Sequence, residues 1–314
     1  MRRRTAMIDT RVVRGEKLWA MMGSMVLATA CTCLGQASGA WQSAAAHAEQ
    51  TAPGARIVVV DVATGRLLAA SHLADAARTL AAPGSTLKPL ALYGLVAAGR
   101  WDPSRRIACS RRLRIAGRSL ACSHPASDPM NAQQALAWSC NSYFAAVGAG
   151  LGPGELRRLL APGGLLGQTG LAPDEAVAEL REPHSADEEA LTLLGVDGVR
   201  VTPLELAAGY RWLALQLAAH SGSAAAQVVQ AGLADSASFG IAAAADAGGI
   251  PVAGKTGTAN LGAGTASHGW FAGLVPAEEP KAVVVVYLPA GHGASAAAVA
   301  ADLIAHSPLR TGAR

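Results

Sequence analysis

The stretch Ala82-Pro83-Gly84-Ser85-Thr86-Leu87-Lys88-Pro89 places a serine and a lysine three positions apart near the start of a predicted helix, Gly84 to Ala98. Residues three apart project from the same face of a helix, so the Ser85 hydroxyl and the Lys88 amine are expected to lie close together. Pro89 is tolerated because the first turn of a helix leaves its amides without intrahelical partners. The stretch therefore predicts a helix that presents a hydroxyl beside an amine.

Lysine is rare in this chain. Of 26 basic residues only four are lysines, at positions 17, 88, 255 and 281. Lysine can lose its proton when it is desolvated, whereas arginine effectively cannot. Because the chain uses arginine almost everywhere else, Lys88 and Lys255 are expected to have a chemical role.

Three short motifs occur in order: Ser85-Thr86-Leu87-Lys88, Ser139-Cys140-Asn141 and Lys255-Thr256-Gly257. The second and third begin 54 and 170 positions after Ser85. This set and its spacing resemble the active-site serine enzymes that act on D-Ala-D-Ala peptides and β-lactams, and the penicillin-binding transpeptidase domains in particular. The resemblance covers roughly residues 55 to 306 and includes segments around the motifs: Ala82 to Pro89, Trp138 to Phe144, Val201 to Ala207 and Gly269 to Pro276.

Five segments read as strands. Arg56 to Asp61 and Arg66 to Ser71 form a predicted hairpin, and the later strands are Val252 to Asn260, His268 to Val275 and Ala282 to Leu288, followed by a helix from Ala294 to His306. This pattern predicts one antiparallel sheet beside a mostly helical region. The resemblance implies the same fold: an α+β, β-lactamase/transpeptidase-like domain with a five-stranded antiparallel sheet flanked by helices. Thr202-Pro203 is predicted to start a helix, and Trp270-Phe271 to pack a sheet face on the terminal helix.

The resemblance also implies catalytic roles. Ser85 would be the nucleophile and Lys88 the base that removes its proton, with a pKa lowered by burial and by the charge of Lys255. Ser139 would relay a proton to the leaving nitrogen. The resemblance implies no metal and no organic cofactor.

Substrate binding would fall to the other motif residues. The Asn141 amide would hold the donor peptide, while Lys255, Thr256 and Thr258 would bind its terminal carboxylate. The backbone amides of Thr258 and of the nucleophile would form an oxyanion hole, and Gly257 would let the substrate backbone approach its strand closely.

The first 48 residues predict an export signal or a membrane anchor. They hold six of the 26 basic and two of the 22 acidic side chains, so residues 49–314 carry 20 of each, which excludes a nucleic-acid-binding charge field. An apolar run from Leu18 to Leu34 precedes Ala46-His47-Ala48, a small-x-small cleavage pattern. Cleavage after Ala48, an uncleaved anchor and lipid attachment at Cys31 remain open. The chain is expected to be exported to the periplasm or another extracytoplasmic compartment.

Residues 49–314 are expected to form one penicillin-binding transpeptidase domain. About 265 residues are enough for one enzyme core and too few for an additional catalytic module such as a fused glycosyltransferase. The implied partners are peptidoglycan stem peptides, β-lactams as covalent inhibitors and a candidate cell-wall synthesis complex, with no nucleic acid.

An arginine-rich stretch, residues 105–123, contains Cys109 and Cys122 on the two arms of a hairpin whose turn is Ala116-Gly117. In an exported chain these cysteines are candidates for a disulfide. A cysteine-ligated zinc is not expected, because the two lack a second nearby pair. Cys140 is expected to point into the core. We interpret the arginines as solvent-exposed side chains of this hairpin. The alternative is that they contact an anionic wall polymer or lipid headgroups.

Other activities share this acylation machinery. A serine β-lactamase would need a deacylating base, for which Glu188 in Glu188-Glu189-Ala190-Leu191-Thr192 is a partial match. A D,D-carboxypeptidase would pass the acyl group to water instead of an amine. A β-lactam or muropeptide sensor would acylate without turnover, although such sensors usually carry several membrane spans.

Overall fold

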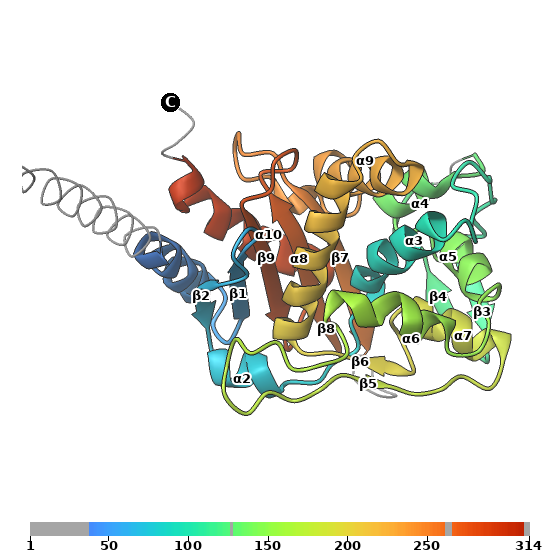
Figure 1. The fold of residues 1–314 in the computed structure, drawn as a ribbon, viewed down its shortest axis with the longest axis horizontal. Coiled ribbons are helices and arrows are strands. Elements are labelled where there is room, and N and C mark those ends of the chain that lie inside the picture. The colour runs from blue at the N-terminus through green and yellow to red at the C-terminus, as the bar shows by residue number, and fades with distance from the viewer. Residues whose placement is uncertain (1–37, 126–127, 261–265, 311–314) are drawn as a thin grey trace, which may run out of the picture.

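A five-stranded antiparallel sheet lies at the centre of the molecule, in the strand order β2-β1-β9-β8-β7 (Figure 1). The computed structural model describes residues 38–125, 128–260 and 266–310. The strands are β1 Arg56–Asp61, β2 Leu67–Ser71, β7 Ala253–Asn260, β8 Ser267–Val275 and β9 Ala282–Leu288. The predicted fold class, with two strands at the front of the chain and three at the back in one sheet, is therefore confirmed.

Both faces of the sheet are covered, which explains its nearly continuous apolar strands. Every residue of β9 is buried. Alternate side chains of a strand point to opposite faces, and accordingly Val283 and Val285 join one hydrophobic cluster while Val284 and Val286 join the other. The sheet thus separates two cores.

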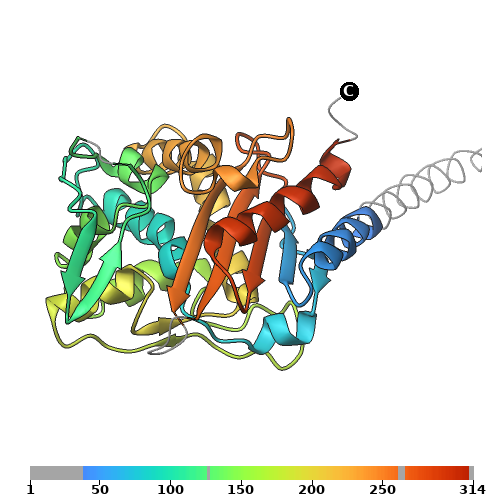
Figure 2. The same cartoon turned by 180° about the vertical axis from the view of Figure 1, so that it is seen from behind.

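Helices form the outer layers. Helix α8, Pro203–Ala219, covers one face, and α10, Gly293–Ala305, covers the other together with a helix of residues 38–51 (Figure 2). The Thr202 side chain caps α8 in a reciprocal capping box with Glu205, which confirms the predicted helix start.

The remaining helices and two small sheets gather mainly on the β7 side of the sheet, and α2 lies below β1 and β2 in the view of Figure 1. The helices are α2 Leu73–Arg78, α3 Lys88–Ala97, α4 Ala132–Ala137, α5 Asn141–Gly148, α6 Glu155–Leu160, α7 Ala186–Leu193 and α9 Ala224–Ser238. Short 3-10 turns are η1 Gly84–Leu87, η2 Ala161–Gly163, η3 Ala243–Ala245 and η4 Pro308–Arg310. The small sheets pair β3 Arg112–Ile115 with β4 Arg118–Ala121, and β5 Glu179–Leu180 with β6 Val199–Arg200.

Two sequence expectations need correction. The predicted helix from Gly84 begins as the 3-10 turn η1, and α3 starts only at Lys88. Trp270 and Phe271 do not share a face: Trp270 packs in the cluster on the α8 side and Phe271 in the cluster on the α10 side. Adjacent residues of a strand must point to opposite faces, so only Phe271 faces the terminal helix.

Turn η1 packs tightly against the edge strand β7. Gly84 has φ of 56°, and a Cβ at this position would lie 2.8 Å from the backbone nitrogen of Thr258. The Gly84 amide donates to the carbonyl of Gly195 at 2.9 Å, and that glycine also leaves no room for a side chain against Gly84. These close backbone contacts fix the turn that carries Ser85.

The helix of residues 38–51 packs on the sheet beside β2. Its Trp41 and Ala48 side chains are buried in the same cluster as α10. The Gln42 amide donates to the carbonyl of Ala70 at 3.0 Å and accepts from the amide of Ala70 at 3.1 Å. The helix therefore satisfies backbone groups of the edge strand β2, a common site of unwanted pairing.

The predicted cleavage pattern Ala46-His47-Ala48 lies within this helix, so cleavage after Ala48 would remove Trp41 from the core. The apolar run Leu18 to Leu34 and Cys31 lie outside the described residues. Across residues 38–310, apart from the gaps at 126–127 and 261–265, no helix is long and apolar enough to cross a membrane.

Substituting Gly84 should destabilise the fold more than substituting a glycine with similar φ in open space. Gly99 has φ of 66° with nothing near its would-be Cβ. Gly99→Ala should cost about 1 kcal/mol for the left-handed conformation, and Gly84→Ala about 2 kcal/mol more from the added clash. Chemical denaturation gives both free energies of unfolding, and equal losses would show that the contact with β7 does not constrain the turn.

Candidate active site

Five of the predicted site residues border one cavity of about 450 Å³: Ser85, Ser139, Asn141, Thr256 and Thr258. They come from η1, from the turn between α4 and α5, and from β7. The structure therefore brings together three segments that are far apart in sequence. The other three predicted residues, Lys88, Lys255 and Gly257, are buried behind this surface.

Lys88 is fully buried and makes three hydrogen bonds. Its Nζ donates to Asn141 Oδ1 at 2.9 Å, to the carbonyl oxygen of Ser139 at 3.1 Å and to Ser139 Oγ at 3.2 Å. Burial lowers the pKa of Lys88 to about 8, and the nearby thiols of Cys122, Cys140 and Cys109 oppose that shift. The free amine is thus accessible near neutral pH.

Lys255 is also fully buried, and its Nζ donates to the carbonyl of Thr256 at 3.1 Å. Burial lowers the pKa of Lys255 well below its usual value, and the charge of Lys88 lowers it further. The sequence predicted that burial and Lys255 together depress the pKa of Lys88. Burial is confirmed as the main cause, while the repulsion between the two lysines acts on Lys255.

Ser139 adopts a left-handed backbone conformation, with φ of 56°. This region is uncommon for a residue other than glycine and persists where the surroundings hold it. Neighbouring backbone bonds do so here: the Ser139 amide donates to the carbonyl of Leu136, and the Cys140 amide to that of Ala135. The turn directs the Ser139 hydroxyl toward Lys88 and leaves it on the cavity wall.

Asn141 connects the lysine to strand β4. Its Oδ1 accepts from Lys88, and its Nδ2 donates to the carbonyl of Ala121 at 3.0 Å. A side-chain amide has two N–H donors, so one remains for another acceptor in the cavity. The sequence-predicted contact with a peptide backbone therefore requires only that remaining N–H.

Strand β7 forms the opposite wall. It is the last strand of the sheet, so one side of its backbone has no strand partner. The hydroxyl of Thr258 accepts from the amide of Gly293, at the start of α10, at 2.9 Å. At Gly257 the space for a Cβ is filled by the carbonyl oxygen of Pro83. The glycine is needed for packing against the turn of Ser85, a reason that differs from the expected approach of a substrate.

Three buried side chains that the motifs did not indicate hold the turn of Ser85. The Tyr210 hydroxyl donates to the carbonyl of Thr86 at 2.9 Å. Trp270 Nε1 donates to the carbonyl of Ala82 at 2.9 Å, and His268 Nε2 lies 2.8 Å from the same oxygen. The sequence indicated a packing role for Trp270 but not this hydrogen bond. Nothing in the local sequence pattern indicated a role for Tyr210 or His268.

Glu188, the partial match to a deacylating base, lies on α7 away from the cavity. Its side chain is half-buried, and its carboxylate accepts from the amide of His184 at 2.8 Å. It is not among the described residues that line the site. Its position therefore does not support a class A β-lactamase mechanism.

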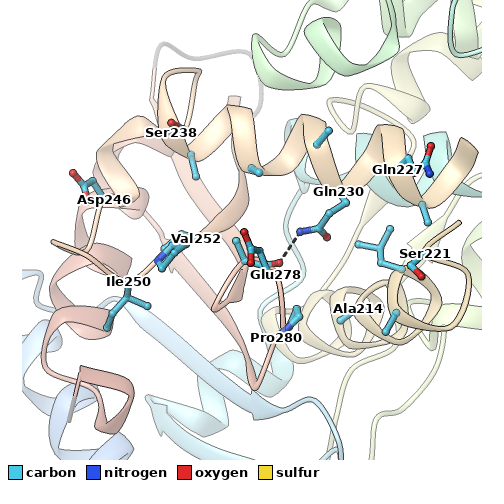
Figure 3. Close-up of a pocket in the computed structure, with 18 of the residues that line it drawn as sticks. Ala214, Ser221, Gln227, Gln230, Ser238, Asp246, Ile250, Val252, Glu278 and Pro280 are labelled. Carbon is cyan, nitrogen blue, oxygen red and sulfur yellow. Dashed lines mark hydrogen bonds between the residues drawn. The ribbon is translucent and has the colours of Figure 1, made fainter. Parts of the chain in front are cut away.

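A second cavity, of about 750 Å³, lies elsewhere, between α8, α9 and the loops near Ile250 and Pro280 (Figure 3). Its described lining includes only two ionisable side chains, Asp246 and Glu278, and Gln230 bonds the backbone of Ala277 beside it. Despite its size, its described lining contains no lysine, histidine or cysteine, and we do not assign it to the reaction.

The candidate disulfide is not formed: Cys109 and Cys122 are free, and their Sγ atoms are 3.5 Å apart. Cys140 is buried, as expected, but it belongs to the same group, together with His124. The expectation that the pair lacks further metal ligands is therefore wrong for the folded chain. In the folded chain two further potential ligands, Cys140 and His124, lie next to this pair, which the spacing in the sequence did not indicate.

Comparison with known proteins gives one family. The model of the penicillin binding protein transpeptidase domain matches residues 55–305. No curated protein sequence matches the chain significantly.

The fold resembles solved transpeptidase structures at low sequence identity. A peptidoglycan glycosyltransferase from Burkholderia ambifaria has a TM-score of 0.76 at 19% identity, covering 89% of this chain and 96% of the other. The transpeptidase domain of Burkholderia pseudomallei penicillin-binding protein 3 has a TM-score of 0.75 at 21% identity, covering 89% and 95%. The D,D-transpeptidase domain of a peptidoglycan glycosyltransferase from Eggerthella lenta has a TM-score of 0.71 at 22% identity, covering 87% and 82%.

The Lys88 amine should titrate near pH 8 instead of near its usual 10.5, because burial disfavours the ammonium form. With only four lysines, NMR of lysine-labelled protein can resolve the signal, which Lys88→Arg identifies. Asn141→Asp places a negative charge 2.9 Å from the amine and should raise this pKa. A Lys88 signal that titrates near 10.5 in the unsubstituted chain would contradict the burial argument.

Proposed function

Because the chain belongs to the penicillin-binding protein transpeptidase domain family, we propose that it is a D,D-transpeptidase that acts through an acyl-enzyme on Ser85. The substrate would be the D-Ala-D-Ala end of a peptidoglycan stem peptide. The observation that carries the proposal is the buried amine of Lys88, with a pKa of about 8, in the same cluster as the Ser139 hydroxyl and directly behind a cavity lined by Ser85.

Proton transfer would begin at Lys88. As an ammonium its three N–H groups are all used by Ser139 and Asn141, and it has no lone pair. As a free amine it keeps two N–H donors and gains a lone pair that can accept the Ser85 proton. Ser85 Oγ then attacks the carbonyl carbon of the penultimate D-Ala, and the negative charge moves to the carbonyl oxygen.

The tetrahedral intermediate would be stabilised by the backbone amides of Ser85 and Thr258, which the close packing of η1 on β7 brings near each other. Its collapse breaks the peptide C–N bond. The proton on Lys88 passes through the Ser139 hydroxyl to the leaving nitrogen, terminal D-Ala departs, and an ester remains on Ser85.

The free edge of β7 would bind the stem peptide as an added strand. Thr256 and Thr258 line the cavity, and their hydroxyls would bind the terminal carboxylate. Lys255 lies behind them with a depressed pKa, and an arriving carboxylate would favour its charged form again. Binding of an anionic substrate and protonation of Lys255 are therefore coupled.

The second half of the reaction sets the activity. Attack on the ester by an amine of a second stem peptide forms a crosslink and restores the Ser85 hydroxyl. Attack by water gives the carboxypeptidase or β-lactamase outcome. The position of Glu188 outside the described lining of the cavity favours transfer over rapid hydrolysis by that carboxylate. We propose that the reaction takes place outside the cytoplasm, on an exported chain.

Labelling with a fluorescent penicillin tests acylation in the full chain. Ser85→Ala should abolish a covalent label that survives denaturing gel electrophoresis, whereas Ser221→Ala, an exposed serine beside the distal cavity, should retain it. Persistence of the label through a chase indicates slow hydrolysis, and its rapid loss with hydrolysed penicillin indicates a β-lactamase. Labelling of the Ser85→Ala chain at the same rate would overturn the proposal.

The acylation rate should depend on pH through Lys88. Its folded-state pKa is lowered to about 8, so the reactive free amine accumulates as the pH rises through that value. The second-order rate of penicillin labelling should increase about tenfold for each unit below pH 8 and level off above it. Lys88→Met should lower the rate at least about 100-fold across the range. A rate independent of pH from 6 to about 9 would exclude Lys88 as the base.

A further inference from the structure

Four metal-ligand side chains meet behind the second motif: Cys109, Cys122, His124 and Cys140. Their ligand atoms all lie within 4.8 Å of one another. Three of the side chains are buried, and Cys109 is half-buried. They come from three places: the segment before β3, the segment after β4, and the residue that precedes α5. Together the four side chains form a complete ligand set that tertiary structure assembles.

We propose that these four side chains bind one Zn²⁺ ion as a Cys₃His site. A tetrahedral zinc with Zn–S bonds of about 2.3 Å and a Zn–N bond of about 2.0 Å holds its ligand atoms roughly 3.5 to 3.8 Å apart. Cys109 Sγ lies 3.5 Å from Cys122 Sγ and 3.2 Å from His124 Nε2. These two distances match a tetrahedral site to within a few tenths of an ångström, and the other ligand atoms lie within 4.8 Å of one another.

The surrounding hydrogen bonds orient the ligands as metal sites require. His124 Nδ1 lies 2.6 Å from the carbonyl oxygen of Pro125, so Nδ1 carries the proton and donates it. The lone pair is then on Nε2, the atom that faces Cys109. A ring N–H donated to a backbone carbonyl is the usual support of a zinc-bound histidine. The amide of Asn141 likewise donates to Cys122 Sγ at 3.2 Å.

The net charge of such a site is small. Zn²⁺ with three thiolates and a neutral imidazole has a net charge of −1, and each thiol that is protonated before binding releases its proton to the solvent. Lys88 lies close enough for its charge to interact with all three cysteines. A disulfide between Cys109 and Cys122 would compete for the same sulfurs, but it would leave Cys140 and His124 without a role, whereas the zinc site uses all four side chains.

The metal would fix the second motif. Cys140 lies between Ser139 and Asn141 in the chain. The backbone N–H of Asn141 donates a hydrogen bond to Cys122 Sγ, and its side-chain Nδ2 donates to the carbonyl of Ala121 on β4. One ion would therefore tie the β3–β4 hairpin to the turn that contacts Lys88. Its role is to position these residues, because none of the four ligands takes part in the proposed acyl transfer, although Cys122 also borders the cavity.

Metal analysis of the full chain tests the site directly. Protein purified with a thiol reductant and without chelator should contain one zinc per chain by mass spectrometry. Replacement by Co²⁺ should give a thiolate-to-cobalt charge-transfer band and the visible bands of tetrahedral Co²⁺. Cys109→Ser and His124→Ala should lose stoichiometric zinc and the thiolate band, while His124→Cys, which preserves four ligands, should retain both.

Controls separate this site from other ligands. Cys31→Ser combined with Cys33→Ser, the other two cysteines of the chain, should retain the full zinc content. His306→Ala removes a ligand from the exposed His47, Asp302 and His306 group and should leave the thiolate band unchanged. Circular dichroism of each variant shows whether lost binding reflects lost folding.

Two results would overturn the proposal. One is reduced, folded protein that binds neither Zn²⁺ nor Co²⁺ with a thiolate band. The other is purified protein in which peptide mapping finds a Cys109–Cys122 disulfide and in which reduction does not restore metal binding. These measurements use no penicillin, so they stand apart from the test of the proposed function.

Discussion

Burial of the Lys88 ammonium is the interaction on which the rest of the site depends. An unpaired charge in the interior is costly, so a buried lysine must be fully hydrogen-bonded or lose its proton. Lys88 combines the two solutions. Three acceptors surround its Nζ, and the pKa of the side chain falls to about 8, so that it loses its proton more easily. The same bonds connect α3 to the turn of Ser139 and Asn141. The lysine that we propose as the base therefore also holds two of the three motifs together.

The third motif is held by backbone packing instead of charge. Gly84 and Gly257 let η1 and β7 approach until backbone atoms are in contact, and a Cβ at either position would overlap the other segment. Tyr210 and Trp270 bind the carbonyl groups on both sides of Ser85. A flexible turn could not keep a hydroxyl in place over an edge strand, whereas this one is fixed by the sheet and by α8. Rigid positioning of this kind is what acyl transfer requires.

Sequence reasoning predicted the strands and the meeting of the motifs because both depend on local or well-spaced patterns. The valines of β9 and the serine-lysine spacing of η1 and α3 are examples. It did not predict which partner each group contacts. Gly257 makes room for the carbonyl of Pro83. Trp270 and Phe271 point to opposite faces of the sheet. The cysteine cluster was missed because its ligands span 31 positions, from Cys109 to Cys140, and only the folded hairpin brings them together.

The central claim is that a covalent intermediate forms on Ser85 within this cavity. A crystal structure of the full chain treated with a penicillin tests it most directly. We expect continuous density from Ser85 Oγ to the opened lactam, with the ester carbonyl oxygen between the amides of Ser85 and Thr258 and the carboxylate against Thr256 and Thr258. Density attached to another residue, such as Cys122, or a ligand that leaves Ser85 Oγ unmodified, would contradict it.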